Sequence, residues 1–358
     1  MSKYLLALNS HPKIGSQTIK KMLAAFCDDA EKLWKSDGRE LKKIYGEKFQ
    51  DMFMEAKNQF DPDEEVKKLR KLGIGYLTFF DKRYPDILRE IYDAPIILYI
   101  KGDINAFNVP AISIVGSRKF SSYGQNVAYR LSKECAENGL GIISGLALGI
   151  DAVAHKGALD ADGITIGVLG CGLDRIYPVA NQGLAYEIIK KGGAIVSEYP
   201  PGTEAFKQNF PARNRIIAGL SKGILVVEAA EISGALITAE AGLEYDREIF
   251  AVPGPITSET SRGCNLLIQK GAKLVQSIDD ILGELNIEKI KFVDKIKEIS
   301  PANDKELSIL EIIGSEDMPA DLILVSSKIN VIELNSLLTI MEMKGLIENV
   351  GGRYRKKI

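Results

Sequence analysis

The segment Ile112-Ser-Ile-Val-Gly-Ser-Arg-Lys-Phe120 decides the fold of this chain. Its first residues form a short β-branched run, and the glycine that follows marks the turn at which a buried strand ends. An amphipathic stretch at Gly124–Asn138 comes next, with the spacing of a helix that packs on a sheet. A strand, a glycine turn and a helix in this order predict the first unit of a parallel α/β sheet.

The same alternation continues to about residue 285. Further strands are expected at Gly141–Ser144, Thr165–Gly170, Ala194–Ser197, Ile224–Glu228, Ile249–Val252 and Lys273–Val275. Helices between them are expected at Ile150–Asp160, Gln182–Lys191, Asn214–Leu220, Ala235–Tyr245 and Asn265–Lys270. Because the strands are apolar almost throughout, both faces of the sheet should be covered. The predicted fold class is therefore α/β, a doubly wound parallel sheet over residues 73–285, with Gly73–Asp103 packed on its edge.

A small all-α domain is expected over residues 1–72, where charged residues alternate with apolar ones at helical spacing. The segment Pro12-Lys-Ile-Gly-Ser16 places a turn before an amphipathic helix, with Ser16 available as the N-cap. This pattern suits a helix-hairpin-helix or SAM-like module, whose backbone amides can hold a phosphate. The signal is weak, and a plain helical turn is the favoured interpretation.

The C-terminal part is expected to be a charged linker over residues 286–303 followed by a winged-helix-like domain over residues 304–358. The third helix of that domain, Val331–Lys344, carries acidic residues and little Arg or Lys, whereas a reader of the major groove needs donors aimed at base edges. A protein contact or a packing role is favoured. The basic end, Arg353 to Lys357, leaves DNA contact open.

Composition narrows the functional classes. The 358 residues are 46% hydrophobic and 26% charged, as in an ordinary globular protein, and the net charge of −2 means that any nucleic-acid site must be local. Four scattered cysteines and the lack of a run of roughly 18 apolar residues predict a reduced cytoplasmic protein with no membrane contact. Because the chain has two histidines, neither a histidine-based zinc site nor a Ser-His-Asp triad is expected. Neither a dinucleotide fingerprint nor a P-loop is present, so no cofactor is expected.

The loops that follow strands are the expected ligand sites, because ligands of open α/β sheets bind beyond the carboxyl ends of the strands. After the first strand, Gly116 allows a close backbone approach, Ser117 offers a hydroxyl and Arg118 offers a rigid fork of donors. These three residues together suit a phosphate. A surface salt bridge is the alternative for Arg118.

Two further loops are candidate anion sites. Ser144 and Gly145 can present backbone amides, and Ser233 with Gly234 opens a helix N-terminus. Within the first of these regions, Asp151 and His155 lie four residues apart on one helical face, where a mutual hydrogen bond is expected rather than catalysis.

The segment Pro200–Arg215 is the most informative. It places Lys207, Arg213 and Arg215 around Phe210. Cations interleaved with an aromatic ring are typical of single-stranded nucleic-acid sites, because the cations follow the phosphates while a base stacks on the ring. The alternative is a core phenylalanine beside a solvated basic edge.

Six motifs in this order resemble the DNA processing protein A family (DprA, also called Smf). They are Gly116-Ser-Arg118, Ser144-Gly-Leu-Ala-x-Gly-Ile-Asp-x-x-Ala-His155, Gly170-x-Gly-Leu-Asp-x-x-Tyr-Pro178, Phe210-Pro-x-Arg-Asn-Arg215, Ser233-Gly-x-Leu-Ile-Thr-Ala239 and Val252-Pro-Gly254. The resemblance covers at least residues 73–282.

The resemblance implies an extended Rossmann fold and a protein that binds single-stranded DNA, protects incoming strands during natural transformation and loads the RecA recombinase onto them. It also implies a homodimer formed through the Rossmann domains, with Gly263–Ala272 as the candidate interface. By the same resemblance, Arg118, Lys207, Phe210, Arg213 and Arg215 would contact the strand. The backbone at Ser144, Gly145, Ser233 and Gly234 would hold phosphates.

Two other hypotheses compete with DNA binding of this kind. Related Rossmann proteins cleave nucleoside monophosphates with a Pro-Gly-Gly-x-Gly-Thr-x-x-Glu loop, but here Thr238 stands where the catalytic glutamate is needed, so no enzyme and no catalytic residue is expected. A duplex-binding regulator would depend on residues 304–358 for all of its DNA affinity, whereas we expect most of the affinity to remain without them.

Overall fold

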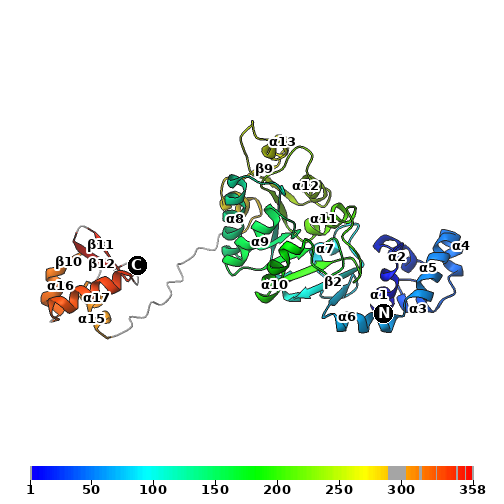
Figure 1. Cartoon of the computed structure of the whole chain (residues 1–358), viewed down its shortest axis with the longest axis horizontal. Coiled ribbons are helices and arrows are strands. Elements are labelled where there is room, and N and C mark those ends of the chain that lie inside the picture. Colours follow the sequence, from blue (N-terminus) through cyan, green and yellow to red (C-terminus); the bar gives the residue numbers. More distant parts are fainter. Residues whose placement is uncertain are drawn as a thin grey trace. The chain divides into compact units, whose positions relative to one another are not determined.

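The computed structural model describes residues 2–288, 304–313, 317–327, 329–343, 346–350 and 352–356. The chain divides into two compact units, Met1–Ile290 and Lys291–Ile358, which are described separately (Figure 1). Of the linker predicted over residues 286–303, residues 289–303 lie outside the described part of the chain.

A nine-stranded sheet in the order β1-β2-β6-β5-β4-β3-β7-β8-β9 forms the centre of the first unit. Its strands are β1 (Gly75–Thr78), β2 (Ile97–Gly102), β3 (Ala111–Val115), β4 (Gly141–Ser144), β5 (Thr165–Val168), β6 (Ala194–Ser197), β7 (Gly223–Val226), β8 (Glu248–Ala251) and β9 (Lys273–Leu274). Strands β3 to β9 are parallel. After β3 the chain adds β4, β5 and β6 on one side of β3, and it then crosses over to add β7, β8 and β9 on the other side. The predicted doubly wound sheet is confirmed, with its switch point at β3.

The segment Gly73–Asp103 is part of the sheet rather than only packed on its edge. Strand β2 pairs antiparallel with β6, and β1 pairs antiparallel with β2. The run Ile96–Ile100 is buried throughout. An apolar run of this length needs cover on both faces and partners for its backbone groups, and a place inside the sheet provides both.

Helices cover both faces of the sheet (Figure 1). They are α7 (Asp86–Arg89), α8 (Ser122–Glu137), α9 (Ile150–Asp160), α10 (Gln182–Lys190), α11 (Asn209–Gly219), α12 (Gly234–Glu244), α13 (Arg262–Gln269) and α14 (Ile278–Glu284), with short 3₁₀ turns η1 (Ile104–Asn108), η2 (Val179–Asn181) and η3 (Glu259–Ser261). Side chains along β3 point alternately to the two faces of the sheet, and each face is covered by its own layer of helices. Ile112 and Ile114 pack in the core under α8, α9 and α14, while Val115 packs in the core under α11, α12 and α13.

Helix α11 begins at Asn209, five residues before the predicted start at Asn214. Pro211 lies in its first turn, where a missing N–H removes no helical hydrogen bond. The earlier start brings Phe210, Arg213 and Arg215 onto one helix.

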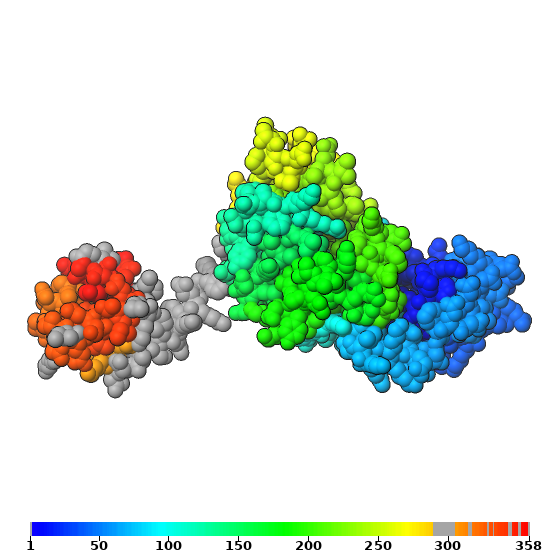
Figure 2. Space-filling model, viewed as in Figure 1, coloured from blue at the N-terminus to red at the C-terminus, as the bar shows by residue number. Residues whose placement is uncertain are grey.

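Six helices form the N-terminal region, seen as the blue lobe in Figure 2. They are α1 (Ser2–Ser10), α2 (Ser16–Ala24), α3 (Ala30–Lys35), α4 (Arg39–Tyr45), α5 (Glu47–Gln59) and α6 (Pro62–Lys71). This region shares a core with the sheet, and Asn9 Nδ2 donates to the Tyr99 hydroxyl at 3.2 Å. The expected N-cap is corrected: Gly15 caps α2, and the Ser16 hydroxyl instead accepts the backbone N–H of Ile96 at 3.1 Å.

The second unit has the winged-helix order. Its elements are α15 (Asp304–Ile313), β10 (Met318–Pro319), α16 (Ala320–Ser327), α17 (Val331–Met343), β11 (Ile347–Val350) and β12 (Arg353–Lys356). The three strands pair in the order β10-β12-β11, and β10 was not expected from the sequence. Within the described residues, no helix of either unit combines the length and apolar character needed to cross a bilayer.

Candidate nucleic-acid interface

The carboxyl ends of β3 to β8 meet at one edge of the sheet, and the loops that follow them form what we call the strand-end rim. Each of these six loops exposes at least one large apolar residue: Phe120, Leu148, Tyr177 with Val179, Phe206, Ile232 and Ile256. Single exposed apolar residues are common on protein surfaces, but a set on six loops of one edge indicates a binding surface.

Arg118, Tyr177 and Phe210 form the centre of this rim. The Cζ atom of Arg118 lies 5.8 Å from the centre of the Phe210 ring, within range of a cation–π contact. The Tyr177 ring lies 5.6 Å from the Phe210 ring, centre to centre. A shallow hollow of about 60 Å³ lies here, lined by Arg118, Gly145, Ala147, Leu148, Tyr177, Pro178, Phe210 and Arg213. Residues from three loops and from the beginning of α11 are thus brought together.

Free positive charge lies on the half of the rim formed by the loops after β3 to β6. Arg118 and Lys207 are exposed, and within the described residues neither side chain makes an ion pair or a hydrogen bond. Arg175 lies on the same half but pairs with Asp174 at 3.5 Å. The exposed acids Glu231 and Glu259 follow β7 and β8. Glu204 is exposed after β6 and Arg262 is exposed after β8, so both halves carry both signs of charge. The exposed Arg118 and Lys207 nevertheless make the half after β3 to β6 the better candidate for a polyanion.

Gly116 and Ser117 shape the loop that carries Arg118. A side chain at Gly116 would come within 2.8 Å of Ile150 and 3.0 Å of the Glu228 carbonyl, so only glycine allows this close packing. The Ser117 N–H donates to that carbonyl at 2.6 Å, and its hydroxyl bonds to Lys119. These donors serve the loop, contrary to the expectation that the Ser117 hydroxyl is free for a phosphate.

The predicted anion site at Ser144 and Gly145 is filled by the protein itself. The Gly145 N–H donates to the Asp151 carboxylate at 3.0 Å, and the Ser144 hydroxyl donates to the Ile114 carbonyl at 2.6 Å. The expected hydrogen bond between Asp151 and His155 was wrong, since His155 Nδ1 bonds Thr165 Oγ1 at 2.7 Å.

Arg213 is part of the framework beneath the rim. Its side chain is buried, with 4% of the residue exposed, and it donates to the carbonyls of Gly145, at 2.6 Å, and Val168. A Cβ at Gly145 would lie 2.5 Å from Arg213 Nη1 and 2.6 Å from Asp151 Oδ2, so the glycine makes room for this pair of opposite charges. Burial lowers the pKa of Arg213 to about 10, which leaves it protonated at neutral pH. Burial raises the pKa of Asp151, and Arg213 opposes that rise.

Arg215 is also committed elsewhere. Its guanidinium pairs with Glu198 and lies 3.6 Å from Asp93. Residues two apart on a helix point about 200° apart. Arg213 and Arg215 therefore leave α11 on different sides, and neither adds free charge to the rim.

The loop before α12 retains an open candidate site. Ser233 is the N-cap, and its hydroxyl accepts the N–H of Ala235 at 3.3 Å. Gly234 is exposed, with open space where a side chain would be. Thr238 is buried in α12. Cys171 is buried as well, and burial raises the pKa of its thiol to about 11.

Sequence reasoning missed Tyr177 and Leu148 as members of the rim. The signal for Tyr177 was its place beside Pro178 in a loop after a strand. Leu148 gave no signal, because one leucine in a glycine-rich turn is indistinguishable from a core residue.

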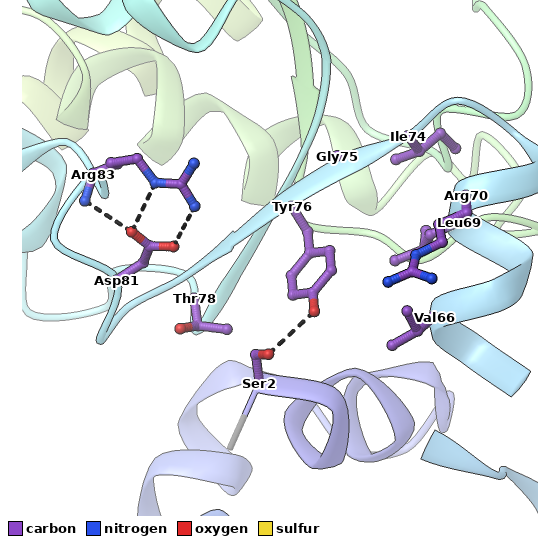
Figure 3. Close-up of a pocket in the computed structure, with 10 residues that line it drawn as sticks. All are labelled: Ser2, Val66, Leu69, Arg70, Ile74, Gly75, Tyr76, Thr78, Asp81 and Arg83. Atoms are coloured by element: carbon purple, nitrogen blue, oxygen red, sulfur yellow. Dashed lines mark hydrogen bonds and ion pairs between the residues drawn. The ribbon is translucent and has the colours of Figure 1, made fainter. Parts of the chain in front are cut away.

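A second hollow, of about 370 Å³, lies between α1, α6 and β1, at the far end of the sheet order from β3 (Figure 3). Here Arg83 Nη2 pairs with Asp81 at 2.9 Å, and the Tyr76 hydroxyl bonds to Ser2 at 3.1 Å (Figure 3). The hollow shares no lining residue with the one on the rim.

Fold and site together define a Rossmann-like α/β protein with an open cationic and aromatic rim in place of a nucleotide pocket. Residues 75–286 match the family model described as DNA recombination-mediator protein A, and residues 297–353 match the DprA winged helix domain. The chain belongs to the DNA recombination-mediator protein A family, as its motifs indicated.

Relatives support the assignment over most of the chain. The DNA processing protein DprA of Streptococcus pneumoniae is 45% identical over 233 residues, which are 65% of this chain and 81% of that protein. Protein Smf of Escherichia coli is 40% identical over 277 residues, which are 76% of this chain and 74% of that protein.

Solved structures agree. The X-ray structure of the Streptococcus pneumoniae protein superposes with a TM-score of 0.70 at 40% identity, covering 79% of this chain and 98% of that one. The protein from Helicobacter pylori, described for its single-stranded DNA binding mode, gives a TM-score of 0.54 at 32% identity over 60% of this chain and 95% of that one.

Proposed function

We propose that this chain binds single-stranded DNA along the half of the rim formed by the loops after β3 to β6, and that it acts in DNA processing and recombination during natural transformation. The observation that carries the proposal is the placement of Arg118 over Phe210, with Tyr177 beside that ring and Lys207 exposed three residues before it. The relative from Helicobacter pylori supports it.

The geometry favours an unpaired strand over a duplex. Exposed aromatic rings stabilise a nucleic acid only if its bases can present their faces, which duplex bases do not, and each stacked base contributes about 1–3 kcal/mol. Arg118 and Lys207 would follow the phosphates while a base stacks on Phe210 or Tyr177. Gly234 has an open helix N-terminus that could hold a further phosphate.

Binding without covalent chemistry fits the positions of the reactive side chains. Cys171, His155 and Thr238 are all buried. A nucleotide-cleaving site would need a general acid or base within hydrogen-bond reach of the substrate.

The finer parts of the role are RecA loading and a homodimer formed through the first unit. A second copy would supply a second binding half-rim of the same kind. Two joined sites bind a long strand more tightly than either site alone. The candidate interface is the segment Gly263–Ala272, which spans most of α13 and leads into the edge strand β9.

The direct test is a salt titration of affinity for an oligothymidine. We expect Arg118→Ala and Lys207→Ala each to weaken binding and to reduce the slope of log K against log salt by about 0.7, the value for one phosphate contact on a single strand. Lys156→Ala is the control, because Lys156 is an exposed cation in the middle of α9. An unchanged slope in both rim variants would contradict the proposal.

A further inference from the structure

Glu228 is a buried carboxylate at the rim that the proposed DNA contacts do not use. It lies just after β7, next to the switch point of the sheet, and only 2% of the residue is exposed. Within the described residues, no basic side chain forms an ion pair with it. Its hydrogen-bond partners are hydroxyl and N–H groups from two neighbouring loops.

The first of these loops is the one that carries Arg118. Glu228 Oε2 accepts the backbone N–H of Ser121 at 2.9 Å, and Oε1 accepts the Ser121 hydroxyl at 2.6 Å. The backbone carbonyl of Glu228 accepts the N–H of Ser117 at 2.6 Å. One residue thus fastens both ends of the segment 117–121, with Arg118 between them.

Helix α8 is built to receive this carboxylate. Ser121 is its N-cap, so the carboxylate lies at the positive end of the helix dipole. A Cβ at Gly124 would lie 2.3 Å from Glu228 Oε2, and the glycine therefore leaves the room that the carboxylate occupies.

The second loop leads into α13. Thr260 Oγ1 donates to Glu228 Oε1 at 3.3 Å, and the N–H of Ala229 donates to the Thr260 carbonyl at 2.8 Å. The carboxylate therefore joins the loops after β3 and β8 through the end of β7 between them.

We propose that Glu228 is a positioning residue for single-stranded DNA binding: it holds segment 117–121 so that the Arg118 guanidinium lies over Phe210. Arg118 has no hydrogen bond or ion pair of its own within the described residues, so its placement depends on the backbone that carries it. This inference rests on the proposed function.

A double-mutant cycle tests it, with affinity for an oligothymidine measured by fluorescence anisotropy at several salt concentrations. The proteins are the wild type, Arg118→Ala, Glu228→Gln and the double variant. We expect Glu228→Gln to weaken binding by about three- to tenfold, since contacting residues couple at this level. It should also lower the salt slope. In the Arg118→Ala background it should change affinity by less than about twofold.

Glu198→Gln is the matched control, because it also removes the charge of a largely buried carboxylate just after a strand of the same sheet, β6, where the partner is Arg215. It should leave DNA affinity unchanged while the protein is folded. Equal weakening by Glu228→Gln in both backgrounds, or no weakening in either, would overturn the inference. If Arg118→Ala alone leaves affinity unchanged, the inference is overturned, and if Lys207→Ala leaves it unchanged as well, the proposed function fails too.

If circular dichroism shows that Glu228→Gln does not fold, Ser121→Ala takes its place in the same cycle. It removes one hydroxyl bond to the carboxylate and leaves the carboxylate buried. A smaller weakening that vanishes without Arg118 supports the inference, and one that persists without Arg118 refutes it.

Discussion

At the scale of single residues, the difference between a binding group and a framework group lies in its partners. Arg118 and Arg213 offer the same donors, and both lie near Phe210. Arg213 gives its donors to two carbonyls beneath the rim. In the part of the chain that the structure describes, the Arg118 guanidinium has only the face of an aromatic ring as its partner. Gly145 is also a framework residue. Its lack of a side chain leaves space for Arg213 and Asp151, and its backbone N–H donates to the Asp151 carboxylate and is therefore not free for a ligand.

His155 makes the protein sensitive to acid. It is fully buried, and burial together with the charge of Arg213 lowers its pKa to about 3. Its pKa in the unfolded chain is about 6.5, so below that pH the unfolded state binds more protons and the folded state loses stability. Between pH 7 and pH 5 this one group should cost about 2 kcal/mol of unfolding free energy.

The measurement is urea unfolding of the wild type and of His155→Gln at both pH values. The variant starts from a lower stability, because it replaces a buried ring, but its loss between pH 7 and pH 5 should be about 2 kcal/mol smaller. Equal losses in the two proteins would show that His155 does not titrate in this way.

At the scale of elements, the parallel sheet explains why residues far apart in sequence meet. Arg118 follows β3 and Phe210 follows β6, with two strands between them in the sheet order. The carboxyl ends of parallel strands lie on one edge, so every βα loop contributes to the same rim. Strands β1 and β2, which pair antiparallel beside β6, do not contribute a loop to the rim.

The edge strand β9 is the element best placed for self-association. It has two residues and begins directly after the candidate interface Gly263–Ala272. Within the described residues it pairs only with β8, and its Leu274 is exposed. We expect Leu274→Glu to yield a monomer in sedimentation velocity and to weaken binding of long strands more than of short ones, because the second site is lost.

Tyr186→Ser is the control for this variant. Tyr186 is an exposed apolar residue on α10, which packs on β5 and β6. A Leu274→Glu protein that sediments like the wild type would remove β9 from the interface.

At the scale of the whole molecule, the chain consists of two compact units, and the proposed DNA contacts all lie in the first. The unit Met1–Ile290 contains the sheet, the rim and three buried cores, whereas Lys291–Ile358 has its own small core. In that second unit, α17 carries Glu333 in its first turn, and Arg355 pairs with Glu348. Neither feature suits a reader of the major groove.

A chain that ends at residue 290 should therefore keep its affinity for single-stranded DNA to within about twofold, as expected when the removed part has no contact with the strand. Filter binding of the full and shortened chains to the same oligothymidine makes the comparison. Loss of all affinity on truncation would instead support the hypothesis of a duplex-type reader in residues 304–358.

The sequence by itself determined the parallel strands of the sheet, most of the helices between them and the family, because hydrophobic period, glycine turns and motif order are local properties that survive without coordinates. It also picked out Arg118 and Phe210, since both follow strands. Only the tertiary structure decided that Arg213, Arg215 and the Gly145 amide serve the framework, that Tyr177 joins the rim and that Glu228 holds the Arg118 loop. The reason is physical: a donor is available to a ligand only if no other group of the protein has satisfied it, and those groups come from distant parts of the chain.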